Sequence, residues 1–347
     1  MRKSLLLYFS IMFSQDLFES SQLNTLTNWF QEPLGWTYPL EINIPDLTTP
    51  ETGFPVCILL HGFGGNGNQL VYQYQNILNT QILIAPTGYM NSWNISNEPS
   101  KAPDVEMISD LVNQLQLFNN INSDKIRIIG FSNGAALANR IFIENYNSGI
   151  DIICSIVSQL SEAQYHNDNF YYPSNGTNGN QEFNGYNDIA IPLIGRKYLN
   201  IGNINDPIIP YFGGAAVGVN FLNSLNSIYL IAKSQGYQGD ILSDEEGIEI
   251  DGSSTYEYNY LSNQVVHLKG NSGHNLNTYQ QQYLVNYLES SPDYGDLNQD
   301  NLVNILDVVI LVNYVLQNIN QSIEYDLNQD DNINILDIIL LINIILV

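Results

Sequence analysis

A turn built from glycine and serine constrains the fold of this chain more than any other segment. Residues 125–129 are rich in isoleucine, Gly130-Phe-Ser-Asn-Gly134 follows, and a run of small residues begins at Ala135. A serine at such a turn takes a strained backbone conformation, so the residues two positions away need to be nearly free of side chain. An ordinary Gly/Ser turn would explain the five residues alone. The strand before them and the helix after them instead predict a turn that presents Ser132 as a nucleophile.

Apolar strands alternate with helical or loop stretches along most of the chain. We expect strands at residues 40–44, 56–61, 81–85, 125–130, 150–157, 197–201 and 264–268. Apolar residues spaced by three and four predict helices at residues 104–118, 135–146, 219–235 and 278–288. Such alternation implies a mainly parallel sheet with helices on both faces. Together with the turn at Ser132, it predicts an α/β fold of the α/β-hydrolase class over residues 16–290.

A serine nucleophile needs a histidine to accept its proton and a carboxylate to orient that histidine. In this fold the order along the chain is serine, acid, histidine. His274 lies in a loop between the last expected strand and the last helix, where the base belongs. The other histidines precede the serine, lie in an Asn-rich insertion or lie inside a strand (His61, His166 and His267). Asp206 directly follows the penultimate strand, so the expected triad is Ser132, Asp206 and His274.

The loop His61-Gly62-Phe63-Gly64-Gly65 follows a buried strand and offers backbone N–H groups. Negative charge that develops on a carbonyl oxygen requires such donors, and the loss of one typically costs roughly 3 kcal/mol of barrier. We expect the amides of Phe63 and Asn133 to form this oxyanion hole.

Charge and the N-terminal segment indicate a secreted protein. The chain has 35 Asp and Glu against 10 Lys and Arg, a formal net charge of -25, which disfavours nucleic acids and anionic membrane surfaces. Met1-Arg2-Lys3 and the apolar residues 4–13 resemble a signal peptide, which we place at residues 1–15. The apolar run at the C-terminus is short and interrupted by Asn343, so we expect no membrane insertion.

Two further features leave alternatives open. Residues 162–188 are rich in Asn, Gly and Tyr, and this long insertion is either a lid or binding wall or a surface loop with incidental aromatic residues. Cys57 and Cys154 both lie in apolar strand-like runs, which favours inert buried thiols over a disulfide.

Five motifs follow one another along the larger part of the chain. They are Val56-Cys-Ile-Leu-Leu-His-Gly-Phe-Gly-Gly65, Ala85-Pro-Thr-Gly88 with Ser92-Trp93-Asn94, Pro103-Asp104-Val105, Gly130-Phe-Ser-Asn-Gly134 and Asp206-Pro-Ile-Ile-Pro-Tyr211. In this order they resemble the polyhydroxybutyrate depolymerase / feruloyl esterase family of secreted esterases. The resemblance implies hydrolysis of carboxylic esters, commonly feruloyl or acetyl esters on plant polysaccharide or short hydroxyalkanoate esters. Family members often carry His-Gly ahead of the acid loop, where this chain has Ile201-Gly202, and its insertion before that strand is longer.

A twelve-residue segment occurs twice in the C-terminal part of the chain, which lacks Lys and Arg after Lys269. Oxygen ligands at loop positions 1, 3, 5, 7, 9 and 12 suit Ca²⁺. The two segments supply these positions as Asp296, Asn298, Asp300, Leu302 (carbonyl), Asn304 and Asp307, and as Asp326, Asn328, Asp330, Asn332 (carbonyl), Asn334 and Asp337. Position 6, usually glycine, is Asn301 or Asp331, residue types that tolerate a left-handed conformation. We therefore expect a structural Ca²⁺ ion in each loop, and no cofactor for catalysis.

Two such loops, each followed by one helix, resemble a type I dockerin domain, which we place with its linker at residues 291–347. The resemblance implies docking to a cohesin-like module and a small all-α domain. Positions 10 and 11 of the loops are Ile305-Leu306 and Ile335-Leu336, apolar where cellulosomal dockerins usually present a polar pair.

The sequence thus predicts a secreted serine esterase that acts on a polysaccharide or polyester substrate. Two alternatives remain. One is a surface or assembly protein whose hydrolase domain has lost activity, and the other is a peptidase or lipase of the same fold. The intact serine, histidine and oxyanion loop argue against the first, and short loops around the turn argue against a lipase.

Overall fold

The computed structural model describes residues 15–174, 183, 185–289, 294–298, 300, 302–317 and 325–346. Residues 1–14 of the expected signal peptide, residues 290–293 at the expected domain boundary and loop position Asn301 lie outside these residues.

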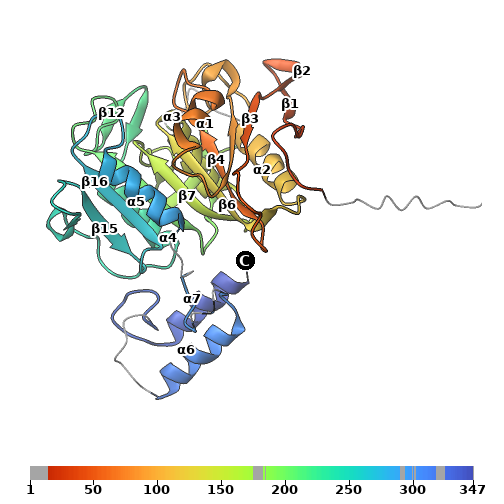
Figure 1. Ribbon diagram of the computed structural model, residues 1–347. Helices are drawn as coiled ribbons and strands as arrows, with labels where there is room; N and C mark the ends of the chain where they lie inside the picture. Colours follow the sequence, from red (N-terminus) through yellow and green to blue (C-terminus); the bar gives the residue numbers. More distant parts are fainter. Residues whose placement is uncertain are drawn as a thin grey trace, which may run out of the picture.

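A mixed sheet of nine strands forms the centre of the larger part of the chain (Figure 1). Its order is β14-β15-β16-β11-β7-β6-β4-β5-β3. The strands from β5 to β16 pair in parallel, whereas β3 is antiparallel to β5 and β15 is antiparallel to β16. The bounds are β3 (Leu40–Asn43), β4 (Phe54–Leu60), β5 (Ile82–Pro86), β6 (Ile121–Phe131), β7 (Ile150–Ile156), β11 (Lys197–Asn203), β14 (Ile248–Glu249), β15 (Tyr256–Tyr260) and β16 (Val265–Gly270). This order and direction confirm the α/β-hydrolase fold with a mainly parallel sheet.

Helices cover both faces of the sheet because its central strands are apolar on both sides. Alternate residues of β4 enter two different cores, with Val56 and Ile58 on one face and Cys57 and Leu59 on the other. The first face packs against α2 (Asp104–Leu115), α3 (Asn133–Glu144) and α4 (Ser224–Ser234), and the second against α1 (Gly67–Tyr74) and α5 (Thr278–Glu289).

Several elements differ from the sequence-based expectation. The helix expected at residues 219–235 is wrong in its first part, because β13 (Val219–Phe221) pairs with β12 (Gly214–Ala216) before α4 begins. A three-residue strand is too short to show its own periodicity. Other elements that the sequence analysis did not predict include β12, β1 (Leu26–Trp29), β2 (Glu32–Thr37), α1, β14, β15 and the three short insertion strands β8 (Tyr165–His166), β9 (Asn169–Pro173) and β10 (Tyr186–Ala190).

The C-terminal part is helical, as expected, with α6 (Ile305–Gln317) and α7 (Ile335–Ile345) packed together. Its small core includes Val308, Leu311 and Leu341, all nearly inaccessible to solvent. Two hydrogen bonds join its second loop to the larger part of the chain. Gln238 N–H donates to the Asn328 carbonyl (2.8 Å), and Leu261 N–H donates to Gln329 Oε1 (2.7 Å).

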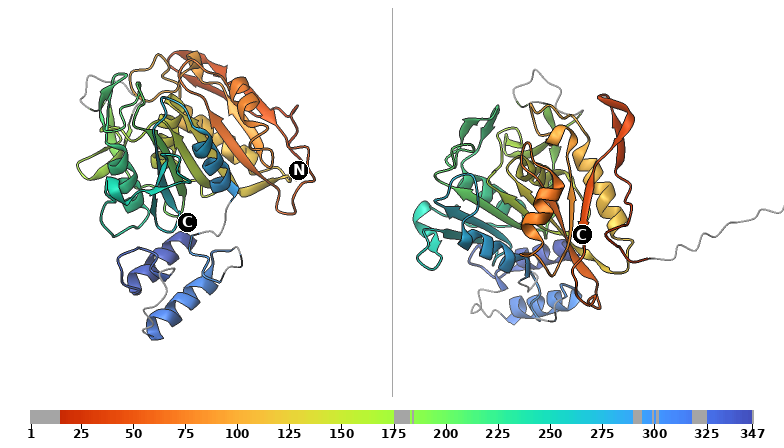
Figure 2. Two further views of the ribbon diagram at one scale, coloured as in Figure 1. Left: turned by 60° about the vertical axis from the view of Figure 1, so that its left-hand side comes forward. Right: turned by 45° about the horizontal axis from the view of Figure 1, so that its top comes forward.

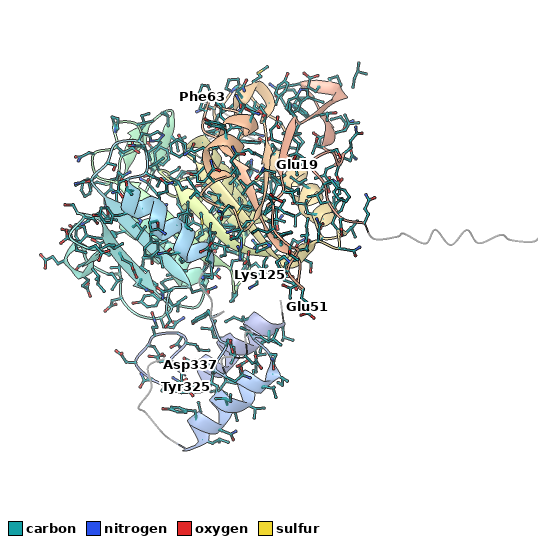
Figure 3. All side chains as sticks on the ribbon, viewed as in Figure 1. Glu19, Glu51, Phe63, Lys125, Tyr325 and Asp337 are labelled. Carbon is teal, nitrogen blue, oxygen red and sulfur yellow. The ribbon has the colours of Figure 1, made fainter. Side chains whose placement is uncertain are left out.

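This contact lies at the edge of the sheet where the parallel strands begin. Leu261 and Gly195 precede β16 and β11, and the Gly195 and Gly236 positions face Ile344 and Leu340 of α7. Phe63, which follows the carboxyl end of β4, lies at the opposite end of the molecule from Asp337 (Figure 3). Two further views show the same separation of the helical part from the upper edge of the sheet (Figure 2).

The two cysteines are buried and free, as expected, and burial raises the pKa of the Cys57 thiol to about 12. Among the described residues, we find no helix with both the length and the apolar character needed to span a membrane.

Candidate active site

Ser132 occupies a sharp turn between β6 and α3. Its φ of 54° and ψ of -116° are strained for a residue with a side chain. A Cβ on Gly130 would lie 2.2 Å from the Gly134 carbonyl oxygen, and a Cβ on Gly134 would lie 2.1 Å from the Leu60 carbonyl oxygen. Only glycine therefore fits at either position, and the turn exposes the Ser132 hydroxyl at the carboxyl edge of the sheet.

The structure brings together Ser132, His274 and Asp206, which are far apart in sequence. His274 Nε2 lies 2.8 Å from Ser132 Oγ, and His274 Nδ1 lies 2.7 Å from Asp206 Oδ2. Asp206 Oδ1 accepts hydrogen bonds from the N–H groups of Ile208 (2.8 Å) and Ile209 (3.0 Å). The Asp206 side chain is only 2% exposed, so the carboxylate is held rigidly and faces the imidazole.

The loop after β4 is held by His61, which the sequence had set aside as a base. His61 Nδ1 lies 2.7 Å from the Gly62 carbonyl oxygen, and its Nε2 accepts the Gly88 N–H at 2.9 Å. The Trp93 indole N–H donates to the His61 carbonyl at 2.7 Å. Burial lowers the pKa of His61, so the ring is neutral near pH 7 and acts as a fixed brace for the loop.

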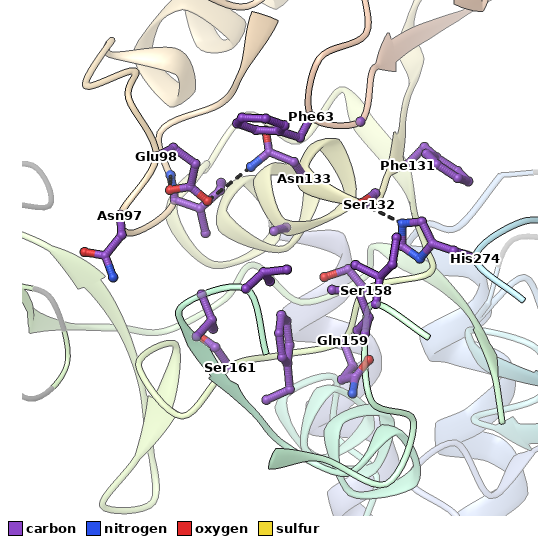
Figure 4. Close-up of a pocket in the computed structure, with 18 of the residues that line it drawn as sticks. Phe63, Asn97, Glu98, Phe131, Ser132, Asn133, Ser158, Gln159, Ser161 and His274 are labelled. Carbon is purple, nitrogen blue, oxygen red and sulfur yellow. Dashed lines mark hydrogen bonds between the residues drawn. The ribbon is translucent and has the colours of Figure 1, made fainter. Parts of the chain in front are cut away.

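Two residues expected to supply backbone donors, Phe63 and Asn133, lie beside Ser132. Asn133 is the first residue of α3, where an N–H has no acceptor within the helix. Within the part of the chain that the structure describes, the Phe63 N–H makes no backbone hydrogen bond. Both residues line one cavity of about 590 Å³ together with Ser132 and His274 (Figure 4). The arrangement can therefore place a carbonyl oxygen between two N–H donors beside the serine hydroxyl.

The cavity is mostly apolar. Its walls come from the loop before α2, the residues after Asp206 and the β12–β13 hairpin, and the apolar members are Phe63, Ile95, Pro99, Phe131, Ala136, Ile208, Ile209, Val217, Val219 and Phe221. Polar side chains at its edge include Gln159, whose amide donates to the Pro210 and Leu222 carbonyls.

Most described aromatic residues of the insertion pack on the protein itself. His166 stacks between Tyr171 and Phe183, each at 3.8 Å between ring centroids. The Tyr186 hydroxyl donates to the Ile95 carbonyl. Among the described residues of the insertion, Gln164 is the one that lines the cavity. The insertion thus supports the wall of the cavity, and its described aromatic rings do not line it.

The sequence analysis missed Asn203, the last residue of β11. Its amide Nδ2 donates to the carbonyls of Gly273 (3.0 Å) and Asn275 (2.9 Å), on both sides of His274. Its Oδ1 accepts from Gln280 Nε2 at 2.9 Å, and both amides are almost fully buried. Asn203 therefore fixes the histidine loop relative to the acid loop that begins three residues later. In a single sequence, neither the spacing of a motif nor a periodic pattern of apolar residues identifies such an amide.

We expect Asn203→Ala to lower kcat by about 10- to 100-fold with little change in KM, because a small displacement of the base is costly for a reaction that depends on alignment. Steady-state kinetics on 4-nitrophenyl acetate would measure this. Asn205→Ala is the matched control, since it removes one exposed hydrogen bond (2.7 Å, to the Asn271 carbonyl) between the same two loops. Equal losses for the two variants would contradict the positioning role.

The two C-terminal loops have nearly the same internal hydrogen bonds. Asp307 accepts the Leu297 and Asn304 N–H groups, both at 2.8 Å, and Asp337 accepts the Asn328 (3.1 Å) and Asn334 (2.7 Å) N–H groups. Position 6 of the second loop is left-handed, as expected, with φ of 63° at Asp331. In the described residues, no three His, Cys, Asp or Glu side chains already converge as a metal site.

The chemistry of the loops nonetheless fits Ca²⁺. The expected ligands in each loop are all oxygen atoms, from the six positions named above. Burial raises the pKa of Asp326, and the nearby carboxylates of Asp337 and Asp330 raise it further. Crowded carboxylates of this kind are relieved by a cation, so these twelve residues are the groups that would hold the two ions.

We expect Ca²⁺ to stabilise the C-terminal part by about 2.7 kcal/mol per loop when the free ion is at 100 times its dissociation constant. Calorimetry of the full chain in chelator and in calcium would show a shift of the corresponding transition. Asp307→Ala with Asp337→Ala should remove that shift, whereas Asp110→Ala, an exposed acid on α2, should keep it. A transition that is the same in chelator and in calcium would contradict the two Ca²⁺ sites.

Comparison with solved structures gives a carboxylesterase from Bacillus cereus (13% identity, TM-score 0.45, 73% of this chain and 93% of that chain) and one from Mesorhizobium loti (13%, 0.45, 73% and 95%). An acetyl xylan esterase from Aspergillus awamori is similar at 12% identity and a TM-score of 0.48, over 72% of this chain and 93% of that chain. Because these identities and TM-scores are low, the fold is assigned from the strand order alone. No curated protein matches this chain. In the C-terminal part, residues 294–346 match the dockerin type I domain.

Proposed function

We propose that this protein is a serine hydrolase of carboxylic esters. The observation that carries the proposal is the continuous hydrogen-bonded chain from Asp206 through His274 to Ser132 at the edge of the cavity. These hydrogen bonds lie beside the backbone N–H groups of Phe63 and Asn133. Acyl transfer requires this combination of an activated serine and two N–H donors.

The reaction follows from these positions. His274 Nε2 removes the proton of the Ser132 hydroxyl while its oxygen attacks the ester carbonyl. The amides of Phe63 and Asn133 stabilise the negative charge on the tetrahedral oxygen. His274 then gives its proton to the departing alcohol, and an acyl-Ser132 ester remains. A water molecule, activated by the same histidine, hydrolyses this ester and releases the acid. Asp206 holds the imidazole in the required tautomer throughout.

For the substrate we propose esters linked to polysaccharide, such as feruloyl or acetyl esters, or short hydroxyalkanoate esters. The motif resemblance supports this class, and the apolar cavity of about 590 Å³ has room for an aromatic or short aliphatic acyl group.

The C-terminal part supports a second proposal, attachment to a cohesin-type partner. It matches the dockerin type I domain and exposes apolar pairs at equivalent positions of its two helices, with Ile305 65%, Leu306 55%, Ile335 58% and Leu336 50% exposed. Interaction sites commonly expose neighbouring apolar side chains, so these pairs are the candidate docking residues. We also propose that the protein is secreted, which agrees with the positively charged and apolar N-terminal segment.

A substrate panel tests the proposed activity. Purified protein is assayed on 4-nitrophenyl acetate, methyl ferulate, acetylated xylan and hydroxybutyrate oligomers, and on peptide and long-chain triglyceride substrates. An alkyl phosphonate ester should inactivate the enzyme with one label, located on Ser132 by mass spectrometry. Faster cleavage of peptides or triglycerides would favour the peptidase or lipase alternative. Failure on every substrate and no label would favour an inactive assembly protein.

A further inference from the structure

Among the described residues that line the cavity, Glu98 is the one acidic side chain, and none is a lysine or arginine. Among its described lining residues, Glu98 and His274 are the ionisable ones, and His274 belongs to the triad. Figure 4 shows the Glu98 side chain beside Asn133. A negatively charged group on a substrate would therefore meet a carboxylate in this cavity and find no lysine or arginine there.

The carboxylate of Glu98 is fixed in place. Its Oε2 accepts the N–H groups of Ile95 (3.2 Å) and Ser96 (2.5 Å). Its Oε1 accepts from Asn133 Nδ2 at 3.3 Å, and Asn133 Oδ1 in turn accepts the Trp93 N–H at 2.8 Å. Both oxygens thus act as acceptors, in the manner of an ionised carboxylate. The bond to Asn133 also ties Glu98 to the residue after the nucleophile.

A nearby lysine does not turn this charge into an anion site. Burial lowers the pKa of Lys101, and the nearby carboxylate of Glu98 offsets only part of this shift. Its Nζ donates to the Ser96 carbonyl at 2.6 Å, on the far side of the wall formed by residues 95–101. There it lines a separate cavity of about 520 Å³ with Arg140 and Glu106.

We propose that Glu98 restricts the site to uncharged esters and excludes those that carry a carboxylate near the scissile bond. An anion entering this mostly apolar cavity loses hydration, gains no cationic partner and is repelled by Glu98. Selection by repulsion is an effective route to specificity, because it acts against the wrong substrate without weakening the right one. This inference rests on the proposed ester hydrolysis and narrows its substrate class.

The test compares two esters of equal chain length, 4-nitrophenyl valerate and mono-4-nitrophenyl glutarate, which differ by a terminal methyl or carboxylate. We expect wild-type kcat/KM for valerate to exceed that for glutarate by at least tenfold. Glu98→Gln should reduce this ratio about tenfold. The ratio is the readout because it cancels any loss that the variant causes for both esters.

Glu106→Gln is the matched control. Glu106 lines the separate cavity, and its substitution changes the net charge by the same amount, so the valerate to glutarate ratio should remain that of the wild type. If Glu98→Gln does not fold, the wild type alone still tests the inference, because equal kcat/KM values for valerate and glutarate would overturn it.

The outcomes separate the inference from the proposed function. Hydrolysis of both esters at equal rates by the wild type would overturn the role of Glu98 and leave the esterase proposal standing. A ratio that falls equally in Glu98→Gln and Glu106→Gln would show that overall charge, and not Glu98, excludes the anion. No hydrolysis of valerate, of glutarate or of 4-nitrophenyl acetate would overturn both proposals.

Discussion

Ser132→Ala is expected to lower kcat/KM for 4-nitrophenyl acetate by about 10,000-fold or more, because the substitution removes the one oxygen that forms the acyl-enzyme bond. The backbone of the turn is set by Gly130 and Gly134, which the substitution leaves in place. The melting temperature should therefore stay close to that of the wild type. Spectrophotometric assay and thermal unfolding of the same preparation would measure both effects.

A surface serine supplies the control for this experiment. Ser174→Ala changes an exposed hydroxyl outside the cavity and should leave turnover within twofold of the wild type. Retention of activity within a factor of ten in Ser132→Ala would show that Ser132 is not the nucleophile.

Asp206→Asn should cost about 10,000-fold in kcat, a loss nearly as large, by reversing the tautomer of His274. The N–H groups of Ile208 and Ile209 both point to Oδ1 of Asp206. An asparagine would keep its oxygen there and turn its NH₂ toward His274 Nδ1. The histidine would then accept at Nδ1 and carry its proton on Nε2, where it could not receive the proton of Ser132.

Kinetics of Asp206→Asn as a function of pH would measure this loss, with Asp240→Asn as the control. Asp240 is exposed and follows α4, so its substitution should leave kcat near the wild-type value. A larger loss of kcat in Asp240→Asn or in Asp188→Asn than in Asp206→Asn would show that Asp206 is not the acid of the triad.

The sequence was most informative where local chemistry or chain order leaves few choices. The turn at Ser132 is specified by two glycines within five residues, and the order serine, acid, histidine then directs attention to Asp206 and His274. The repeated loops are equally direct, since ligand spacing in a twelve-residue segment is a local property. Predicting these elements requires no information about contacts between distant segments.

Contacts between distant segments could not be predicted in the same way. Asn203 contacts Gly273 and Gln280 only in the folded protein. The apolar residues that predict β11 do not indicate a role for its last residue, which is polar. Glu98 lies in an irregular loop that has no period at all. The aromatic residues of the insertion were ambiguous because stacking within the insertion and stacking on a ligand require the same residue types.

The helical C-terminal part contacts the sheet where β11 and β16 begin, and the cavity lies where the strands end. The proposed docking and the proposed hydrolysis therefore take place at opposite ends of the molecule. A large partner bound to the C-terminal part would not cover the cavity. Ser132 would then face away from that partner. Such an orientation would suit the proposed hydrolysis of polysaccharide-linked esters, because a large polymer could reach the cavity without meeting the docking partner.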